Sequence, residues 1–480
     1  MTSTEKVYSA PTHYIVVPRN DWYVFFDPLH FSFTRVNEHG KAILESVGQE
    51  STAPRIAERV AKRFGYEPGD IENGVAAFLE DMTATKFIHE GPYKPRIAEP
   101  PDLEHGRPGT LYVHPTYSCN LSCIYCYNKK ERKVAPVGEL TTRDWFGIFD
   151  QAKELGIHHI VFTGGEPLLR YDIFELARYV NDAGMTGQLL TNGLLVGGHN
   201  IDEIMKTFGA VGFSIDSHIR EKNDSLRGKG AFDATVNAMR IMHANDFSCT
   251  AKAVITKHNV DELPDLYRFF LEEFGSSNLI PNLFIPPVRE MIDLLPALED
   301  YLEAMNRVGT VVEDFYGDDK ASILRFHGIP ARQYQCGAGA GEISLGPDGS
   351  VYPCQALHKD EFHAGTITER SLREIYYDSP VLKKLRGCTV DSLETCRDCD
   401  VKYLCGGGCR SLAYNLFGEI DCHNSYSCEY LRSLAYAMLW NSSCVPVDQL
   451  RALQHEQKKA GIPQGTAFEK EPADEPRTPC

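Results

Sequence analysis

The chain has 480 residues, is 42% hydrophobic and 24% charged, and carries a formal net charge of -17. This composition is typical of a globular protein of about two to four domains, and no apolar run approaches the ~18 residues of a membrane span. The acidic balance argues against a nucleic-acid partner, and the start of the chain lacks the apolar core of a secretory signal. We therefore expect a cytoplasmic protein without membrane or nucleic-acid partners.

The first predicted unit spans residues 1–95 and combines three short strands with three helices. Apolar runs at 14–19, 22–28 and 31–36 read as strands. Apolar positions at spacings of three and four then predict helices over 40–48, 54–65 and 70–82, with Gly48 and Gly65 as stop signals. Residues 96–109 are rich in proline and charge, which is typical of a linker.

Strands and helices alternate through residues 110–325. Strands are predicted near 113, 161, 190, 214, 253 and 285, and helices over 142–155, 172–180, 232–243 and 262–274. This alternation favours an α/β fold with six parallel strands wound as a partial (β/α)6 barrel. Catalytic groups are then expected where the strands end.

Residues 326–445 are short segments rich in glycine and cysteine, and we expect metal ligation there to replace part of an apolar core. The polar stretch 446–480 predicts a disordered tail. In a reducing compartment stable disulfides are uncommon, so metal ligation is the leading explanation for most of the 15 cysteines. We assign no individual role to Cys249, Cys388, Cys422, Cys444 and Cys480.

The first cysteine group, Cys119, Cys123 and Cys126, lies in one loop directly after an apolar strand. Three thiolates can hold three corners of a cubane iron-sulfur cluster and leave the fourth iron open for chemistry. A zinc knuckle is the alternative, but no fourth cysteine lies within thirty residues on either side.

This CxxxCxxC spacing, with Tyr125 just before the third cysteine, resembles the motif of the radical S-adenosylmethionine (SAM) superfamily. The resemblance implies that Cys119, Cys123 and Cys126 are catalytic, because their [4Fe-4S] cluster reduces bound SAM to a 5′-deoxyadenosyl radical. It also implies an external electron donor such as flavodoxin or ferredoxin, and a set of residues that contact SAM: Tyr125, Gly164, Gly165, Glu166 and Pro167 of a GGEP motif, Thr191, Asn192, Ser214, Asp216 and Arg227. For the polar strand-end residues, a plain hydrogen-bonding role is the alternative. Val254 and Ile255 flank the adenine or pack in the core.

The later cysteines follow the pattern of the SPASM domain, which holds two auxiliary clusters. Twelve residues separate Cys336 from Gly349, four separate Gly349 from Cys354, and a CxxCxxxxxCxxxC motif follows. By resemblance, one auxiliary [4Fe-4S] cluster is held by Cys396, Cys399, Cys405 and Cys428, and the other by Cys336, Cys354 and Cys409. Together with the radical-generating cluster, the resemblance therefore implies three [4Fe-4S] clusters. The second auxiliary set is one ligand short: either Cys388 or Cys422 completes it, or one iron is open for a substrate sulfur.

The N-terminal unit is similar to the winged-helix-like domain that recognises leader peptides beside peptide-modifying enzymes. A small sheet with a free edge can bind such a leader as an added strand. A barrel-capping domain is the alternative. The resemblance thus implies three parts: a winged-helix-like α+β recognition domain, a radical SAM partial barrel and a SPASM domain.

A peptide or small protein with a leader is therefore the expected substrate, and an intrapeptide cross-link the expected product. A cysteine-to-carbon thioether is favoured. The layout is also similar to maturation proteins of quinohemoprotein amine dehydrogenase, which join cysteine to aspartate or glutamate. Formylglycine formation is an alternative, but Gln355 follows Cys354 where sulfatase maturases place aspartate. Other peptide C–C or C–O cross-linking, epimerisation, or a non-catalytic electron carrier remain as further alternatives.

Overall fold

The computed structural model describes residues 6–19, 21–48, 50–84, 86–94, 102, 106–128, 138–247, 249–276, 278–317, 332–422 and 425–440. The predicted tail 446–480, with Cys444 and Cys480, and most of the predicted linker 96–109 lie outside these residues. None of the described helices is both long and apolar enough to span a membrane.

The N-terminal unit contains the three strands and three helices that the sequence predicts. An antiparallel sheet in the order β2-β3-β4 is followed by three helices: β2 (Ile15–Arg19), β3 (Trp22–Asp27), β4 (Ser32–Asn37), α1 (Glu38–Val47), α2 (Ala53–Phe64) and α3 (Pro68–Ala84). Gly65 ends α2 in the left-handed conformation, as its position suggested. A second small sheet was not predicted: β5 (Ser51–Thr52), β1 (Val7–Ser9) and β6 (His89–Glu90).

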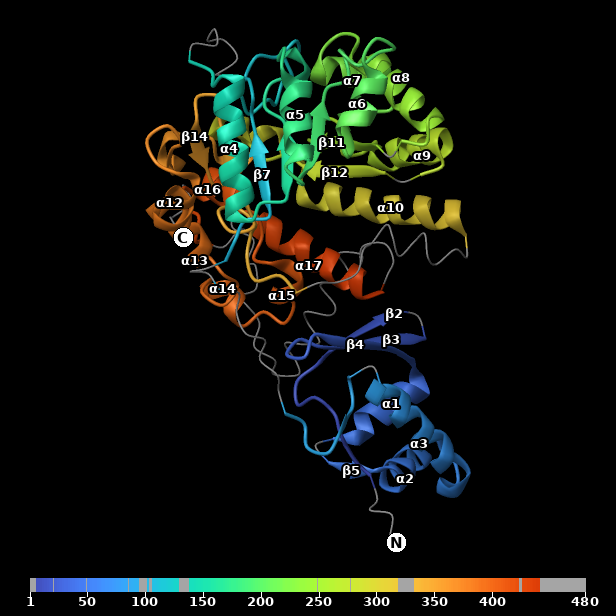
Figure 1. Ribbon diagram of the computed structural model, residues 1–480. Coiled ribbons are helices and arrows are strands. Elements are labelled where there is room, and N and C mark those ends of the chain that lie inside the picture. The colour runs from blue at the N-terminus through green and yellow to red at the C-terminus, as the bar shows by residue number, and fades with distance from the viewer. Residues whose placement is uncertain are drawn as a thin grey trace.

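The two faces of the β2-β3-β4 sheet pack against different partners. On one face, Phe25 lies in a core with the helices of the same unit. On the other, Val17 and Val24 pack against Leu404 and Leu439 of the C-terminal domain. Figure 1 shows this sheet directly below α17 (Ser425–Trp440), which separates it from the barrel. The N-terminal unit is therefore docked onto the cysteine-rich domain.

Six parallel barrel strands are present, five of them where the sequence predicts them and the sixth about four residues earlier than predicted. They lie in chain order: β7 (Thr110–Val113), β8 (His159–Phe162), β9 (Thr186–Thr191), β10 (Ala210–Ser214), β11 (Cys249–Ile255) and β12 (Leu279–Leu283). The helices between them cover the outer face (Figure 1): α4 (Thr142–Leu155), α5 (Ile173–Asp182), α6 (Ile201–Thr207), α7 (Arg220–Arg227), α8 (Ala231–Ala244) and α9 (Leu263–Phe274). The sequence reading missed α6, α7 and α10 (Leu298–Tyr316).

The cysteine-rich domain continues the barrel sheet, which the sequence did not predict. β13 (Glu342–Leu345) pairs parallel with β7, and β14 (Ser350–Tyr352) and β15 (Gly365–Thr366) follow antiparallel, which gives a nine-stranded sheet. The rest of the described domain is helical: α12 (Leu372–Asp378), α13 (Pro380–Gly387), α14 (Glu394–Arg397), α15 (Lys402–Cys405), α16 (Arg410–Phe417) and α17. Because β13 and β7 are neighbours, the segment that ends at Cys354 is held beside the barrel opening.

Candidate active site and auxiliary cysteine sets

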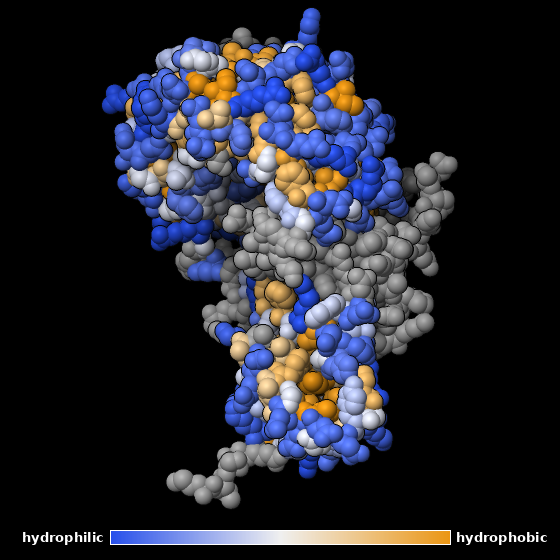
Figure 2. Space-filling model, turned by 90° about the vertical axis from the view of Figure 1, so that its right-hand side faces the viewer, coloured by the Kyte–Doolittle hydropathy of each residue, from blue (hydrophilic) through white to orange (hydrophobic). Residues whose placement is uncertain are grey.

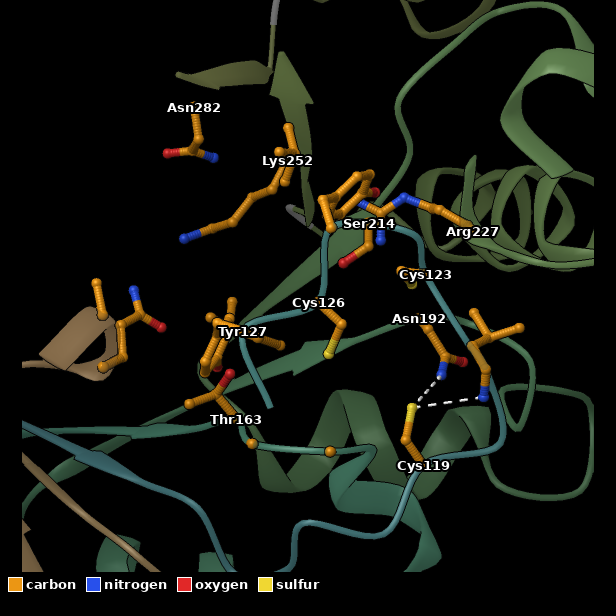
Figure 3. A pocket seen from close by; sticks show the side chains of 18 of the residues that line it. Cys119, Cys123, Cys126, Tyr127, Thr163, Asn192, Ser214, Arg227, Lys252 and Asn282 are labelled. Atoms are coloured by element: carbon orange, nitrogen blue, oxygen red, sulfur yellow. Dashed lines mark hydrogen bonds between the residues drawn. The ribbon is translucent and has the colours of Figure 1, made fainter. Parts of the chain in front are cut away.

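A cavity of about 330 Å³ opens at the ends of the barrel strands. Cys119, Cys123 and Cys126 line it, and so do most of the residues that the sequence nominated as SAM contacts. Figure 3 shows the three cysteines and Asn192 on one side of this cavity. The nominated residues that line it are Tyr125, Gly164, Gly165, Thr191, Asn192, Ser214 and Arg227, and Val254 lines it as well.

The cysteine loop is bound to two neighbouring segments. Cys119 Sγ accepts hydrogen bonds from the Leu121 amide at 3.5 Å and from Asn192 Nδ2 at 3.9 Å. The Ile124 amide donates to the Leu226 carbonyl at 3.0 Å, which ties the loop to α7. Burial raises the pKa of the Cys123 thiol to about 11. Ligation by this thiol therefore requires loss of a proton that the cavity otherwise retains.

Gly164 and Gly165 hold the cysteine loop against the end of β8. The Gly165 amide donates to the Thr116 carbonyl at 2.9 Å, and the Glu166 amide donates to the Ser118 carbonyl at 2.8 Å. A Cβ atom at position 165 would lie 2.0 Å from the Ser118 carbonyl oxygen, and Gly164 has a φ of +115°. The sequence reading expected these glycines to admit a ligand. In the structure, their lack of side chains leaves room for the backbone segment that precedes Cys119.

Two of the nominated carboxylates, Glu166 and Asp216, lie behind the cavity wall, where other groups of the protein donate hydrogen bonds to them. Glu166 is 1% exposed and accepts hydrogen bonds from the Thr191 hydroxyl and the Asn192 amide, both at 2.8 Å. Burial raises its pKa to about 7, against the lowering effect of these hydrogen bonds. Pro167 is likewise buried and does not line the cavity. Glu166 thus braces the strand ends that carry Thr191 and Asn192.

Asp216 braces the cavity wall on the other side of the cavity in the same way. Its carboxylate accepts hydrogen bonds from Arg227 at 2.7 Å, from the Val254 amide at 2.8 Å and from the Tyr125 hydroxyl. It is 1% exposed and does not line the cavity, whereas Ser214 does. Of the two residues proposed to flank the adenine, Val254 faces the cavity and Ile255 is in the core.

The later cysteines gather into the two sets that the sequence predicts. Burial raises the pKa of Cys428 to about 12, and the neighbouring charges of Cys399, Cys405 and Cys396 raise it further. Burial likewise raises the pKa of Cys354, and Cys336 and Cys409 contribute to that shift. Each set is therefore close enough for mutual electrostatic influence.

A single zinc ion needs ligand atoms closer together than any three of the described cysteine sulfurs lie. Zn–S bonds of about 2.3 Å place tetrahedral ligand atoms about 4 Å apart. Within the described residues, the group whose ligand atoms all lie within 4.8 Å of one another is Asp27, His30 and His89, and no set of three cysteines meets this limit. Asp27 itself accepts hydrogen bonds from His30 and Tyr93 at 2.8 and 3.0 Å, which explains that group as a structural network.

Three family models match this chain. The radical SAM superfamily matches residues 113–270, the iron-sulfur cluster-binding (SPASM) domain matches 336–400, and coenzyme PQQ synthesis protein D matches 23–88. Among curated proteins, an AdoMet-dependent heme synthase of Methanosarcina barkeri is 30% identical over 332 residues, which cover 63% of this chain and 91% of the relative. The chain belongs to the radical SAM superfamily.

Other radical SAM proteins are similar over different shares of the chain. Mycofactocin maturase MftC of Mycobacterium ulcerans is 28% identical and aligns with 67% of this chain and 88% of its own length. The structure of Streptococcus suis SuiB with bound S-adenosylmethionine has a TM-score of 0.53 at 16% identity, over 87% of this chain and 99% of its own. The structure of native anSMEcpe with bound AdoMet has a TM-score of 0.57 at 21% identity, and the match covers 69% of this chain and 98% of anSMEcpe. These structures share the fold.

The sequence reading missed several residues that line the radical SAM cavity. They face the three cysteines or the opposite wall: Tyr127, Thr163, Lys252, Asn282, Phe284, Gln355 and Ala356. Lys252 carried a usable signal, since it is a charged residue at an inward position of an otherwise apolar strand. Gln355 and Ala356 carried none, because only the pairing of β13 with β7 brings their segment to the cavity.

The auxiliary set of Cys336, Cys354 and Cys409 lacks a fourth ligand. Besides Cys388 and Cys422, the structure offers Glu342 as a candidate. The antiparallel register pairs Ser344 with Tyr352, and its continuation places Glu342 opposite Cys354. The Glu342 carboxyl carbon lies 3.6 Å from the position of a Cβ atom at Gly337, next to Cys336. Within the described residues its carboxylate forms no hydrogen bond. By contrast, the thiols of Cys388 and Cys422 donate to the backbone carbonyls of Lys384 and Glu419, at 3.4 and 3.5 Å.

We therefore expect Glu342→Ala to change the electron paramagnetic resonance spectrum of one auxiliary cluster, or to remove about four irons per chain. Cys388→Ala and Cys422→Ala should retain all the iron of the wild type. Iron analysis and low-temperature spectra of the three reconstituted variants measure this. Burial raises the pKa of the Cys388 thiol, and the charge of Cys336 contributes to this shift. Cys388 is therefore the main alternative to Glu342 as the fourth ligand. Loss of a cluster in Cys388→Ala alone would assign the position to that cysteine.

The close approach at Gly165 leads to a second expectation. Gly165→Ala forces a Cβ atom against the Ser118 carbonyl, so the cysteine loop must shift. The variant should lose most 5′-deoxyadenosine formation and about four irons, as a misplaced three-cysteine loop retains its cluster poorly. Gly198→Ala is the matched control, because an added Cβ there has no atom within 4 Å. Iron content and a chromatographic assay for 5′-deoxyadenosine compare the two, and equal values would contradict the role of Gly165.

Proposed function

We propose that this radical SAM enzyme builds intrapeptide cross-links, most of all thioethers between cysteine sulfur and a carbon atom, in a ribosomally made peptide or small protein. The observation that carries the proposal is the N-terminal unit, a small sheet with an available edge that is docked beside the auxiliary cysteine sets. A barrel enzyme that acts only on small molecules has no need of such a unit.

The edge of β4 supports peptide recognition. In the order β2-β3-β4, the strands β2 and β4 are at the edges. β2 contains Pro18, which lacks an amide hydrogen and weakens that edge for pairing, whereas β4 contains no proline. A leader peptide can therefore add to β4 through backbone hydrogen bonds. Figure 2 shows hydrophobic side chains gathered on this unit, which suit the side chains of an added strand.

The similar proteins include both peptide-modifying enzymes and a heme synthase, and they support a peptide substrate more than a heme precursor. The SuiB structures, one of them bound to the precursor peptide SuiA, cover 86–87% of this chain, and a mycofactocin maturase is among the relatives. The heme synthase aligns with 63% of this chain. The PqqD match at 23–88 adds a domain that a heme-forming reaction does not explain.

Three four-iron clusters and SAM are the proposed cofactors. Cys119, Cys123 and Cys126 would hold the radical-generating cluster, and the cavity beside them would hold SAM between Gly164, Asn192 and Ser214. When bound, this pair supplies a 5′-deoxyadenosyl radical that abstracts hydrogen from the substrate. The protein positions the reacting groups, because Glu166 and Asp216 brace the strand ends that form the cavity walls.

Formylglycine formation is disfavoured at one position. Gln355 lines the cavity, so the residue where sulfatase maturases place aspartate does face the reaction space here. An amide in that place cannot accept a proton from a substrate cysteine or serine as a carboxylate can. Thioether formation has no such requirement at this position.

The test uses a small cysteine-rich peptide with its leader, sought among the reading frames that flank the gene, with reconstituted enzyme, SAM and dithionite in place of the natural electron donor. Thioether formation breaks one C–H and one S–H bond and forms one C–S bond, so each cross-link should make the peptide two hydrogens lighter. The cross-linked cysteine should also resist iodoacetamide. A peptide without its leader is the control and should react far more slowly.

Two outcomes would contradict this proposal. A product that reacts with hydrazide reagents would identify formylglycine instead. An unchanged peptide mass, together with 5′-deoxyadenosine formation by the same enzyme, would exclude cross-linking of this peptide and leave only a mass-neutral change such as epimerisation.

A further inference from the structure

Lys252 is a cation that lines the cavity and does not contact the cysteine loop or the bracing carboxylates Glu166 and Asp216 through any hydrogen bond or ion pair among the described residues. Along β11, Ala251, Ala253 and Ile255 are buried in the barrel core, whereas Thr250, Lys252 and Val254 alternate with them and are partly exposed. Lys252 and Val254 line the cavity. Figure 3 shows the Lys252 side chain reaching toward the side of the cavity that is far from Cys119, where Asn282 also lies.

The neighbouring strand leaves room for this side chain. Lys252 is in register with Ser214 of β10, and Gly212 lies two residues earlier on the same face. A Cβ atom at Gly212 would be 2.6 Å from Leu190 Cδ2 and 3.3 Å from Lys252 Cε. The glycine therefore provides the space in which the aliphatic part of Lys252 packs.

No acidic side chain of the described residues pairs with Lys252. Among the described residues that line the cavity, two are basic, Arg227 and Lys252, and none is an aspartate or glutamate. Arg227 is paired with Asp216 at 2.7 Å. Within the described part of the chain, Lys252 forms no ion pair and no side-chain hydrogen bond, and burial lowers its pKa. A partly buried ammonium without a partner is costly, and an anionic ligand would offset that cost.

Two anions can enter this cavity, the methionyl carboxylate of SAM and a carboxylate of the substrate. The methionyl group belongs near the cysteines, where Ser214 and Arg227 stand beside Cys123 (Figure 3). Lys252 extends away from that wall, and the amide groups of Asn282 and Gln355 also line the cavity. A cation with two neutral amide donors matches a carboxylate better than an apolar side chain or a second cation.

We propose that Lys252 binds the side-chain carboxylate of an aspartate or glutamate in the substrate peptide, and so places that acidic residue in the cavity for modification. This inference rests on the proposed function and narrows it. It agrees with the cysteine-to-aspartate or cysteine-to-glutamate thioether that the sequence raised as an alternative. Lys252 is a specificity-determining residue in this account.

The test measures binding rather than turnover. The probes are a synthetic five-residue peptide with one cysteine and one glutamate, capped at both ends, and the same peptide with glutamine. Calorimetry on the SAM-loaded holoenzyme gives the affinity for each. The wild type should bind the glutamate peptide about tenfold more tightly, which corresponds to about 1.4 kcal/mol. Lys252→Met, which retains the length of the side chain, should bind both peptides equally, and Lys252→Arg should restore most of the preference.

Several results would overturn the inference. These are an equal affinity of the wild type for both peptides, no binding of either at millimolar concentration, or a preference that persists in Lys252→Met. A loss of SAM affinity in Lys252→Met, measured without peptide, would instead assign Lys252 to the methionyl carboxylate. Iron content and thermal midpoint of each variant check the fold. The proposed function fails separately, when the precursor peptide undergoes no change of mass in the wild type.

Discussion

Replacement of Cys119, Cys123 and Cys126 by alanine is expected to abolish 5′-deoxyadenosine formation and to remove about four of about twelve irons per chain. The three sulfurs line the cavity, and none of the other described residues that line it has an acidic side chain that could replace them as a ligand. The auxiliary sets lie in a different domain with their own ligands, so their iron should remain. Iron analysis and a chromatographic assay for 5′-deoxyadenosine measure the two effects.

Cys249→Ala is the matched control for this variant. Cys249 begins β11 and packs against the barrel core, and burial raises its pKa to about 11, as it does for Cys123. Loss of its thiol should leave both iron content and 5′-deoxyadenosine unchanged. An unchanged iron content in the triple variant would contradict the assignment of the first cluster.

Deletion of residues 1–94 is expected to stop peptide modification while the radical cavity still forms 5′-deoxyadenosine. The reason for the first effect is loss of the recognition edge on β4. The structure adds a second effect, because the β2-β3-β4 sheet covers Val401, Leu404 and Leu439, with Cys399 at the margin. Exposure of each such side chain costs about 1.5–3 kcal/mol. The truncated enzyme should therefore also lose thermal stability and part of the iron held by Cys396, Cys399, Cys405 and Cys428.

A variant that loosens this interface separates the two effects. Leu439→Ala removes a fully buried side chain from α17 and leaves the β4 edge intact. Its unfolding free energy should fall by about 2–5 kcal/mol, and it should still modify the peptide. Calorimetry and mass spectrometry measure these quantities. If the truncated enzyme modified the full-length peptide at the normal rate, the N-terminal unit would have no recognition role.

The sequence by itself determined the order of elements and the identity of the cysteines. Alternation of strands and helices at 110–285 predicted the six parallel strands, because hydrophobic periodicity is a local property that survives without tertiary information. The spacing of Cys119, Cys123 and Cys126 identified the family for the same reason: three ligands of one cluster lie on one short loop. The N-terminal strands and helices were also predictable from their periodicity.

Tertiary structure alone decided which distant residues share a site. Glu342 and Gln355 reach the barrel because β13 pairs with β7 across more than 200 residues of chain, and no local pattern encodes that pairing. Glu166 and Asp216 look like ligand groups in the sequence, and in the folded chain both are buried and accept several hydrogen bonds from the protein itself. Lys252 shows the opposite case. The sequence indicated its position on β11, but only the folded structure shows that no described acidic side chain pairs with its charge in the cavity.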